Sequence, residues 1–107
     1  INVQVDKVYL DLNTAVPCGF ILNELVTNSL KHAFPSGRKG EVTVELRSNE
    51  RNKTQISVSD NGIGLPNDFN FNNPQSLGLM LVKDLVRQLN GKIEYTSENG
   101  ASFTITF

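Results

Sequence analysis

Apolar and polar residues alternate along several short stretches of the chain, and a period of two residues predicts strands. Residues 41–48 alternate cleanly, and residues 54–60 alternate again after a polar turn, so we expect these two half-buried strands to pair as a hairpin. Residues 92–97 and 102–107 predict a second hairpin. Apolar and polar positions mix less regularly in residues 1–12, which predicts one or two short strands there.

Two other stretches have the 3.6-residue period of helices. Residues 14–34 predict a first helix with Thr14 as its N-cap and Pro17 in its first turn. Residues 77–90 predict a second helix that stops at Gly91. The residues expected to face the core from the first helix are Cys18, Leu22, Leu25, Val26, Ser29 and Ala33.

Segments rich in proline, glycine and asparagine separate the periodic stretches. Pro35-Ser36-Gly37 should end the first helix. Residues 65–76 form a loop near the upper length of an unstructured connection, which makes it a candidate lid. Its Phe69 and Phe71 have no periodic partner, so the lid is expected to be mobile without a ligand. The element order predicts an α/β two-layer sandwich: a mixed, largely antiparallel sheet with the helices on one face.

Composition limits the classes of protein to which the chain can belong. Its 107 residues with ordinary apolar content fit one domain, residues 1–107. The formal net charge of -1 provides no basic field, so nucleic acid is not an expected partner. Cys18 and His32 are the single residues of their types, which excludes an internal disulfide and a structural zinc site.

The termini and the hydropathy of the chain bear on its location. No apolar stretch approaches the roughly 20 residues that span a bilayer, and no signal pattern opens the chain. We therefore expect a cytoplasmic domain without direct membrane insertion. Because the chain begins at Ile1 without a methionine, we expect it to be a fragment of a longer protein.

Four polar residues, Glu24, Thr27, Asn28 and Lys31, form one stripe along the first predicted helix. One interpretation is a solvated polar face, which most helices have. The other is a metal and phosphate site. The amide oxygen of Asn28 suits magnesium, Lys31 can neutralise phosphate charge, and Glu24 could orient or deprotonate an attacking group.

The end of the strand at residues 54–60 carries a second candidate. Asp60 shares the parity of the core residues of its strand, so its carboxylate needs a hydrogen-bond donor. The amino group of adenine is such a donor. Gly62 and Gly64 would allow positive φ values and a close backbone approach to a ligand. The alternative is an Asn-Gly hairpin turn, but Leu65-Pro66 and the asparagine-rich loop follow where a hairpin requires an alternating strand.

Ser76-Leu77-Gly78-Leu79 opens the second predicted helix. A glycine at this position exposes free amides at the positive end of the helix dipole, where a phosphate is well placed. The chain contains no glycine-rich loop ending in Gly-Lys-Ser/Thr, and Gly62-Ile63-Gly64 lacks the third glycine of the dinucleotide fingerprint. These absences exclude the two commonest nucleotide-binding loops.

Together the three motifs resemble the nucleotide-binding boxes of the GHKL superfamily, which unites sensor histidine kinases, gyrase-type ATPases, MutL repair proteins and heat-shock ninety chaperones. Residues 23–34 resemble the N box, residues 60–64 the first glycine box and residues 77–79 the second. Lys31-His32-Ala33-Phe34-Pro35 and residues 77–91 resemble a subgroup of bacterial and archaeal sensor histidine kinases. The implied architecture is a Bergerat-type ATP-binding fold.

The resemblance implies ATP and Mg²⁺ as cofactors. It implies that Asn28 binds magnesium, that Asp60 reads the adenine amino group and that Lys31 contacts phosphate. Glu24 occupies the position of the water-activating base in the ATPase relatives. His32 should lie at the pocket rim in a packing or phosphate-contacting role. The residues implied to shape the pocket and lid are Gly62, Gly64, Leu77, Gly78 and Leu79.

The sequence departs from the family pattern at two places. The second glycine box has one glycine, Gly78, where many kinases have two. Gly100-Ala101-Ser102-Phe103 resembles a Gly-Thr-x-Phe ending, but Ala101 cannot offer the threonine hydroxyl to phosphate.

The implied function is that of a histidine protein kinase in two-component signal transduction. The domain would donate the γ-phosphate of ATP to a histidine on a separate helical dimerisation domain of the same protein, with a response regulator downstream. Without that domain it would be inactive in autophosphorylation. The alternatives are a serine kinase of the anti-sigma-factor type and a module that senses ATP without transferring phosphate.

Overall fold

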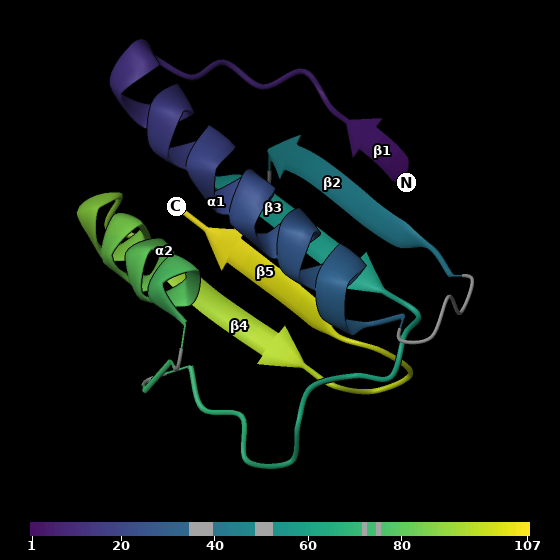
Figure 1. Cartoon of the computed structure of the whole chain (residues 1–107). Coiled ribbons are helices and arrows are strands. Elements are labelled where there is room, and N and C mark those ends of the chain that lie inside the picture. Colours follow the sequence, from purple (N-terminus) through teal and green to yellow (C-terminus); the bar gives the residue numbers. More distant parts are fainter. Residues whose placement is uncertain (35–39, 49–52, 72, 75) are drawn as a thin grey trace.

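The computed structural model describes residues 1–34, 40–48, 53–71, 73–74 and 76–107. Five strands and two helices follow one another along the described chain (Figure 1). Their bounds are β1 (Asn2–Val5), α1 (Leu12–His32), β2 (Val42–Ser48), β3 (Thr54–Asp60), α2 (Leu77–Gln88), β4 (Lys92–Thr96) and β5 (Ser102–Thr106).

The five strands form one sheet in the order β1-β2-β3-β5-β4. β1 pairs with β2 in parallel, and the other neighbouring strands are antiparallel. Both helices lie over the same face of the sheet (Figure 1). The predicted two-layer α/β architecture, with a mixed and largely antiparallel sheet, is therefore confirmed.

The register of the strands builds the core beneath the helices. Val44, Val58 and Phe103 are directly paired neighbours across three strands, and Leu46, Ile56 and Ile105 form the next such row. Because side chains alternate between the two faces of a strand, both rows point toward the helices. The helices complete the core with Cys18, Ile21, Leu25, Val82 and Val86, all buried.

The first helix begins earlier than its apolar pattern predicts. Asp11, not Thr14, is the N-cap: its Oδ1 accepts a hydrogen bond from the amide of Thr14 at 2.8 Å. Both residue types cap helices, so their chemistry alone does not decide between them. Pro17 is consequently the sixth helical residue and lies in the second turn, not the first. Ile21, which the predicted core face omitted, is completely buried.

The end of α1 agrees with its prediction to within two residues. The last helical residue is His32 and the C-cap is Ala33. The predicted stop sequence Pro35-Ser36-Gly37 lies outside the described residues. No helix among the described residues combines the length and the apolarity that crossing a bilayer requires.

The second helix ends at a left-handed residue. The sequence predicts that the helix stops at Gly91, and the residue with the positive φ is Asn90, at 55°. The amide of Gly91 donates to the carbonyl of Val86 at 2.9 Å, and the amide of Asn90 donates to the carbonyl of Arg87 at 3.0 Å. These two bonds form a Schellman motif, in which asparagine replaces the more usual glycine at the left-handed position.

Candidate functional site

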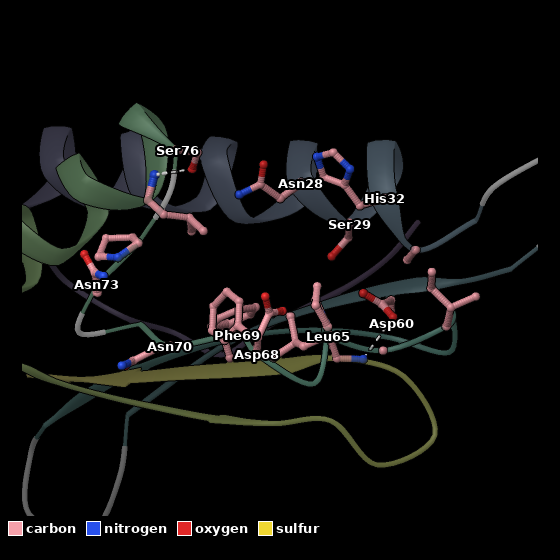
Figure 2. A pocket seen from close by; sticks show the side chains of 18 residues that line it. Asn28, Ser29, His32, Asp60, Leu65, Asp68, Phe69, Asn70, Asn73 and Ser76 are labelled. Carbon is pink, nitrogen blue, oxygen red and sulfur yellow. Dashed lines mark hydrogen bonds between the residues drawn. The ribbon is translucent and has the colours of Figure 1, made fainter.

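A cavity of about 610 Å³ lies between the C-terminal half of α1, the loop after β3 and the start of α2 (Figure 2). Its volume falls within the range of small-molecule binding pockets. Asn28, Ser29, His32 and Ala33 line it from α1, and Ser76 and Leu79 line it from the start of α2. The residues that line it from the sheet and the loop include Asp60, Gly64, Leu65, Asp68, Phe69 and Ala101.

The carboxylate of Asp60 is fixed on the sheet side of this cavity. Its Oδ1 accepts hydrogen bonds from the amides of Gly62 at 3.0 Å and Ala101 at 3.1 Å. The predicted need for an external donor therefore holds for only part of the group, because two backbone amides already satisfy Oδ1. Oδ2 remains the oxygen that can accept a hydrogen bond from a bound molecule.

The turn between β4 and β5 holds residues 60–65, the glycine segment, in place. Gly100 has a φ of +117°, and a Cβ there would overlap the Asp60 carbonyl and lie 3.0 Å from the Asn61 Cα. Ser97 Oγ accepts a hydrogen bond from the Leu65 amide at 2.8 Å. Gly64 has a φ of +82°, and its Cβ would lie 2.7 Å from the same hydroxyl. The positive φ predicted at Gly64 is thus observed.

Gly62 packs against the C-terminus of α1. Its φ is not positive, and it does not line the cavity. A Cβ on Gly62 would overlap Ala33, and the neighbouring Ile63 amide donates to the Ala33 carbonyl at 3.0 Å. Gly62 therefore permits close packing of the segment against the C-terminus of α1.

The polar stripe of α1 divides between different surroundings. Asn28 lines the cavity, whereas Lys31 is exposed and is not part of its lining. Glu24 is half-buried outside the cavity, and a Cβ on Gly78 would overlap its Oε2. The structure thus brings Asn28, His32, Asp60, Gly64 and Leu79 together around one cavity. It places Glu24, Lys31, Gly62, Leu77 and Gly78 outside the lining.

The start of α2 is capped by a residue of the cavity lining. Ser76 Oγ accepts a hydrogen bond from the Leu79 amide at 3.2 Å, and the Ser76 carbonyl accepts one from Met80 at 3.1 Å. The positive end of the α2 dipole therefore adjoins the cavity, although Gly78, where the sequence predicts free amides, lies outside the lining.

The two phenylalanines of the predicted lid, which have no periodic partner along the sequence, pack against residues of distant strands. The Phe69 ring stacks edge-to-face on Tyr95, with ring centroids 5.2 Å apart, and also contacts Phe103 at 6.1 Å. Phe71 is only 3% exposed and belongs to the core. The alternation that revealed the strands could not reveal these contacts, because the partners lie in β4 and β5, more than 20 residues away.

The charge of the cavity lining is acidic. Its described ionisable side chains are His32, Asp60 and Asp68, and no lysine or arginine is among them. Cys18 lies apart from the cavity in the core, where burial raises the pKa of its thiol and makes it a poor nucleophile.

The donor set fits a nucleotide with its magnesium. Asp60 Oδ2 can accept a hydrogen bond from an amino group, and the positive end of the α2 dipole would favour a phosphate elsewhere on the cavity wall. Asn28 offers the kind of hard oxygen ligand that magnesium prefers. Among the described residues there is no group of three or more His, Cys, Asp or Glu that could hold a metal by protein ligands alone. A bound magnesium would therefore share its ligands with the phosphates.

Several known proteins are similar to this chain in sequence. The family model for "Histidine kinase-, DNA gyrase B-, and HSP90-like ATPase" matches residues 14–107. Blue-light-activated histidine kinase 2 of Erythrobacter litoralis is 36% identical over 98 residues, which are 90% of this chain and 28% of that protein. Sensor histidine kinase PdtaS of Mycobacterium tuberculosis is 36% identical over 95 residues, 87% of this chain and 19% of that protein.

A solved structure agrees with these sequence matches. The histidine kinase domain of the Erythrobacter litoralis EL346 blue-light activated histidine kinase superposes with a TM-score of 0.93 at 31% identity. The match covers 99% of this chain and 49% of that one. The chain spans less than a third of the length of the two curated relatives, at 28% and 19%.

Proposed function

This chain belongs to the family of histidine kinase-, DNA gyrase B- and HSP90-like ATPases, and we propose that it is the ATP-binding catalytic domain of a sensor histidine kinase. The resemblance found in its three motifs is thereby confirmed at the level of the family. The proposal extends to the roles of individual residues, the phosphate transfer and the partners.

The observation that carries the proposal is the position of Asp60. Its carboxylate lies at the cavity wall, and two backbone amides hold Oδ1, at 3.0 and 3.1 Å. Because the carboxylate is already oriented, its Oδ2 can accept a hydrogen bond from the amino group of adenine without reorganising. Guanine carries a carbonyl oxygen in place of that amino group and would face the carboxylate with an acceptor. The site should therefore prefer adenine nucleotides.

The phosphates would extend from the base toward Asn28 and the α2 N-terminus. Magnesium, when bound, supplies positive charge that offsets the phosphates. Asn28 would be its protein ligand, and the first turn of α2 would orient the phosphates with its dipole. His32, which lines the cavity one turn after Asn28, would contact the phosphates from the rim.

The geometry gives less support to the two remaining assignments. Lys31 is exposed and lies outside the lining, so its contact with phosphate rests on the family resemblance. Glu24 faces Gly78 of α2, so its action as a base would require the carboxylate to leave that contact. We retain both as candidate catalytic residues on the resemblance alone.

The chemistry proposed is transfer of the γ-phosphoryl group to a histidine of a separate helical dimerisation domain in the same protein. The chain's residues would bind and orient the nucleotide, and the loop after β3 would exclude water. His32 is not the acceptor in this proposal. It lies on the same helix as Asn28, about 6 Å further along the axis at about 1.5 Å per residue, and cannot move into line independently of the site. A response regulator would then receive the phosphate in the cytoplasm.

The test is phosphotransfer from labelled ATP. The chain alone should retain no acid-labile phosphate, and addition of the parent protein's histidine-bearing hairpin should restore labelling of that hairpin. Labelling of His32 in the isolated chain would contradict the separation of donor and acceptor. Transfer to a serine of a partner would favour the anti-sigma-factor type of kinase, and nucleotide binding without any transfer would favour an ATP sensor.

A further inference from the structure

The cavity lining contains a second carboxylate, that of Asp68, to which adenine recognition assigns no role. Asp68 lies in the loop after β3 and lines the same cavity as Asp60. A nucleotide phosphate is strongly anionic, and no lysine or arginine is found among the described lining residues. An acidic side chain in that position would repel the phosphates unless a cation lies between them.

Asp68 and Asn28 approach the cavity from opposite walls. Figure 2 shows Asn28 on α1 on one side of the cavity and Asp68 on the loop after β3 on the other. The carboxylate of Asp68 is directed toward the helix. The two residues offer a carboxylate and an amide, which are hard oxygen ligands. A cation between the two walls would therefore have a carboxylate on one side and an amide side chain on the other.

The backbone next to Asp68 is held in place. The amide of Phe69 donates to the carbonyl of Pro66 at 3.0 Å, which closes a turn around Asp68. The Phe69 ring is seated against Tyr95, with centroids 5.2 Å apart. The carboxylate of Asp68 is thus presented from an anchored turn.

Asp68 itself forms no hydrogen bond or ion pair with the part of the chain that the structure describes. Asp60, in contrast, accepts hydrogen bonds from two backbone amides. The two carboxylates of the cavity therefore differ in kind: one is oriented by the protein, and the other has its oxygen atoms available.

We propose that Asp68 is a second protein ligand of the nucleotide-bound magnesium, opposite Asn28, bound directly or through one of the ion's waters. This inference rests on the proposed function. Magnesium in nucleotide sites is commonly held by one or two carboxylates together with phosphate oxygens and water, which matches this donor set. The cation, and not Lys31, would then carry most of the charge compensation for the phosphates inside the cavity.

Calorimetric titration with ATP, with magnesium and with a chelator in its place, tests the proposal. Asp68→Asn should weaken Mg-ATP binding about tenfold, equivalent to about 1.4 kcal/mol. The same variant should bind metal-free ATP at least as tightly as the wild type, because a repelling charge has been removed. Asn28→Ala should also lose magnesium enhancement. Asp84→Asn is the matched control, since Asp84 is an exposed acid on α2 outside the cavity lining.

The opposite signs of the two effects separate this role from others. If Asp68→Asn weakens ATP equally with and without magnesium, the residue contacts the ribose or supports the loop, and the proposal is wrong. If neither affinity falls, Asp68 is a solvated acid and the proposal is again wrong. A wild-type chain that binds no adenine nucleotide would refute the proposed function itself. Nucleotide binding with an unchanged magnesium dependence in Asp68→Asn would refute this inference alone.

Discussion

Asp60 and Ala101 are 41 residues apart in sequence and are joined by two hydrogen bonds. The Asp60 amide donates to the Ala101 carbonyl at 2.9 Å, and the Ala101 amide donates to Asp60 Oδ1 at 3.1 Å. The turn between β4 and β5 therefore sets the orientation of the carboxylate that we assign to adenine. Ala101 lacks the threonine hydroxyl of the family ending that it resembles, but its backbone amide positions the Asp60 carboxylate.

Gly100 should consequently control nucleotide affinity without touching the nucleotide. Gly100→Ala places a Cβ against the Asp60 backbone at a φ of +117°, so it should destabilise the fold by about 1 to 3 kcal/mol. Because Asp60 must shift, ATP affinity should also fall at temperatures where the variant is fully folded. Thermal melting and calorimetry on the same sample measure both effects. Unchanged affinity in the folded variant would show that the turn does not position Asp60.

Gly78 and Glu24 should be energetically coupled. A methyl group at Gly78 would overlap the Glu24 carboxylate, although alanine is the better helix former by about 1 kcal/mol. Gly78→Ala should therefore bring little or no stability in the wild type but should stabilise a Glu24→Ala background. Chemical denaturation of the four proteins in this double-mutant cycle measures the coupling.

Gly19→Ala is the matched control for that cycle, because nothing lies within 4 Å of a Cβ at this α1 position. It should stabilise the protein by about 0.5 to 1 kcal/mol in either background. Equal effects of Gly78→Ala with and without Glu24 would contradict the contact between the two helices.

Phe71 should anchor the loop after β3 to the core. Its side chain is 3% exposed, so Phe71→Ala should lower the free energy of unfolding by about 3 to 5 kcal/mol. Leu77→Ala, at a position 72% exposed near the other end of the loop, should change it by less than about 0.5 kcal/mol. Urea denaturation compares the two variants. Similar small losses in both would mean that the loop is not anchored.

Cys18 should be protected from thiol reagents in the folded protein. Burial raises the pKa of its thiol, so the thiolate is scarce near neutral pH and the side chain is inaccessible. The folded state favours the protonated form, so this contribution to stability is full below the ordinary thiol pKa of about 8.5 and declines as the pH rises toward the folded-state value. Maleimide labelling as a function of urea should follow unfolding. Fast labelling of the native protein would contradict the burial.

The parts of the fold that depend on local pattern could be predicted from the sequence. Apolar and polar residues alternate cleanly in β2 and β3, and the strand predicted over residues 54–60 agrees with the observed β3 at both ends. The helix ends were less accurate because two residues suited to the same terminal position lie near each other: Asp11 and Thr14 at the start of α1, Asn90 and Gly91 at the end of α2. Such choices depend on how the rest of the chain packs.

The candidate site was predictable in its residue types more than in its geometry. A helical stripe shows which residues share a face, but it does not show that α2 covers Glu24 while the cavity opens at Asn28. The contacts of Ser97 and Ala101 with the glycine segment join residues 32 and 41 positions apart, so no local pattern could reveal them. Asp68 belongs to no recognised motif, and only its position in the cavity lining indicates a role.

Adenine recognition by Asp60 is the central claim, and calorimetric titration of the wild type and Asp60→Asn with ATP and GTP tests it most directly. The wild type should bind ATP and discriminate against GTP. Asp60→Asn should lose about tenfold or more in ATP affinity, because hydrogen bonds to charged groups contribute about 1.5 to 3 kcal/mol. Equal affinity of the wild type for ATP and GTP, or unchanged ATP binding by a folded Asp60→Asn variant, would contradict the account.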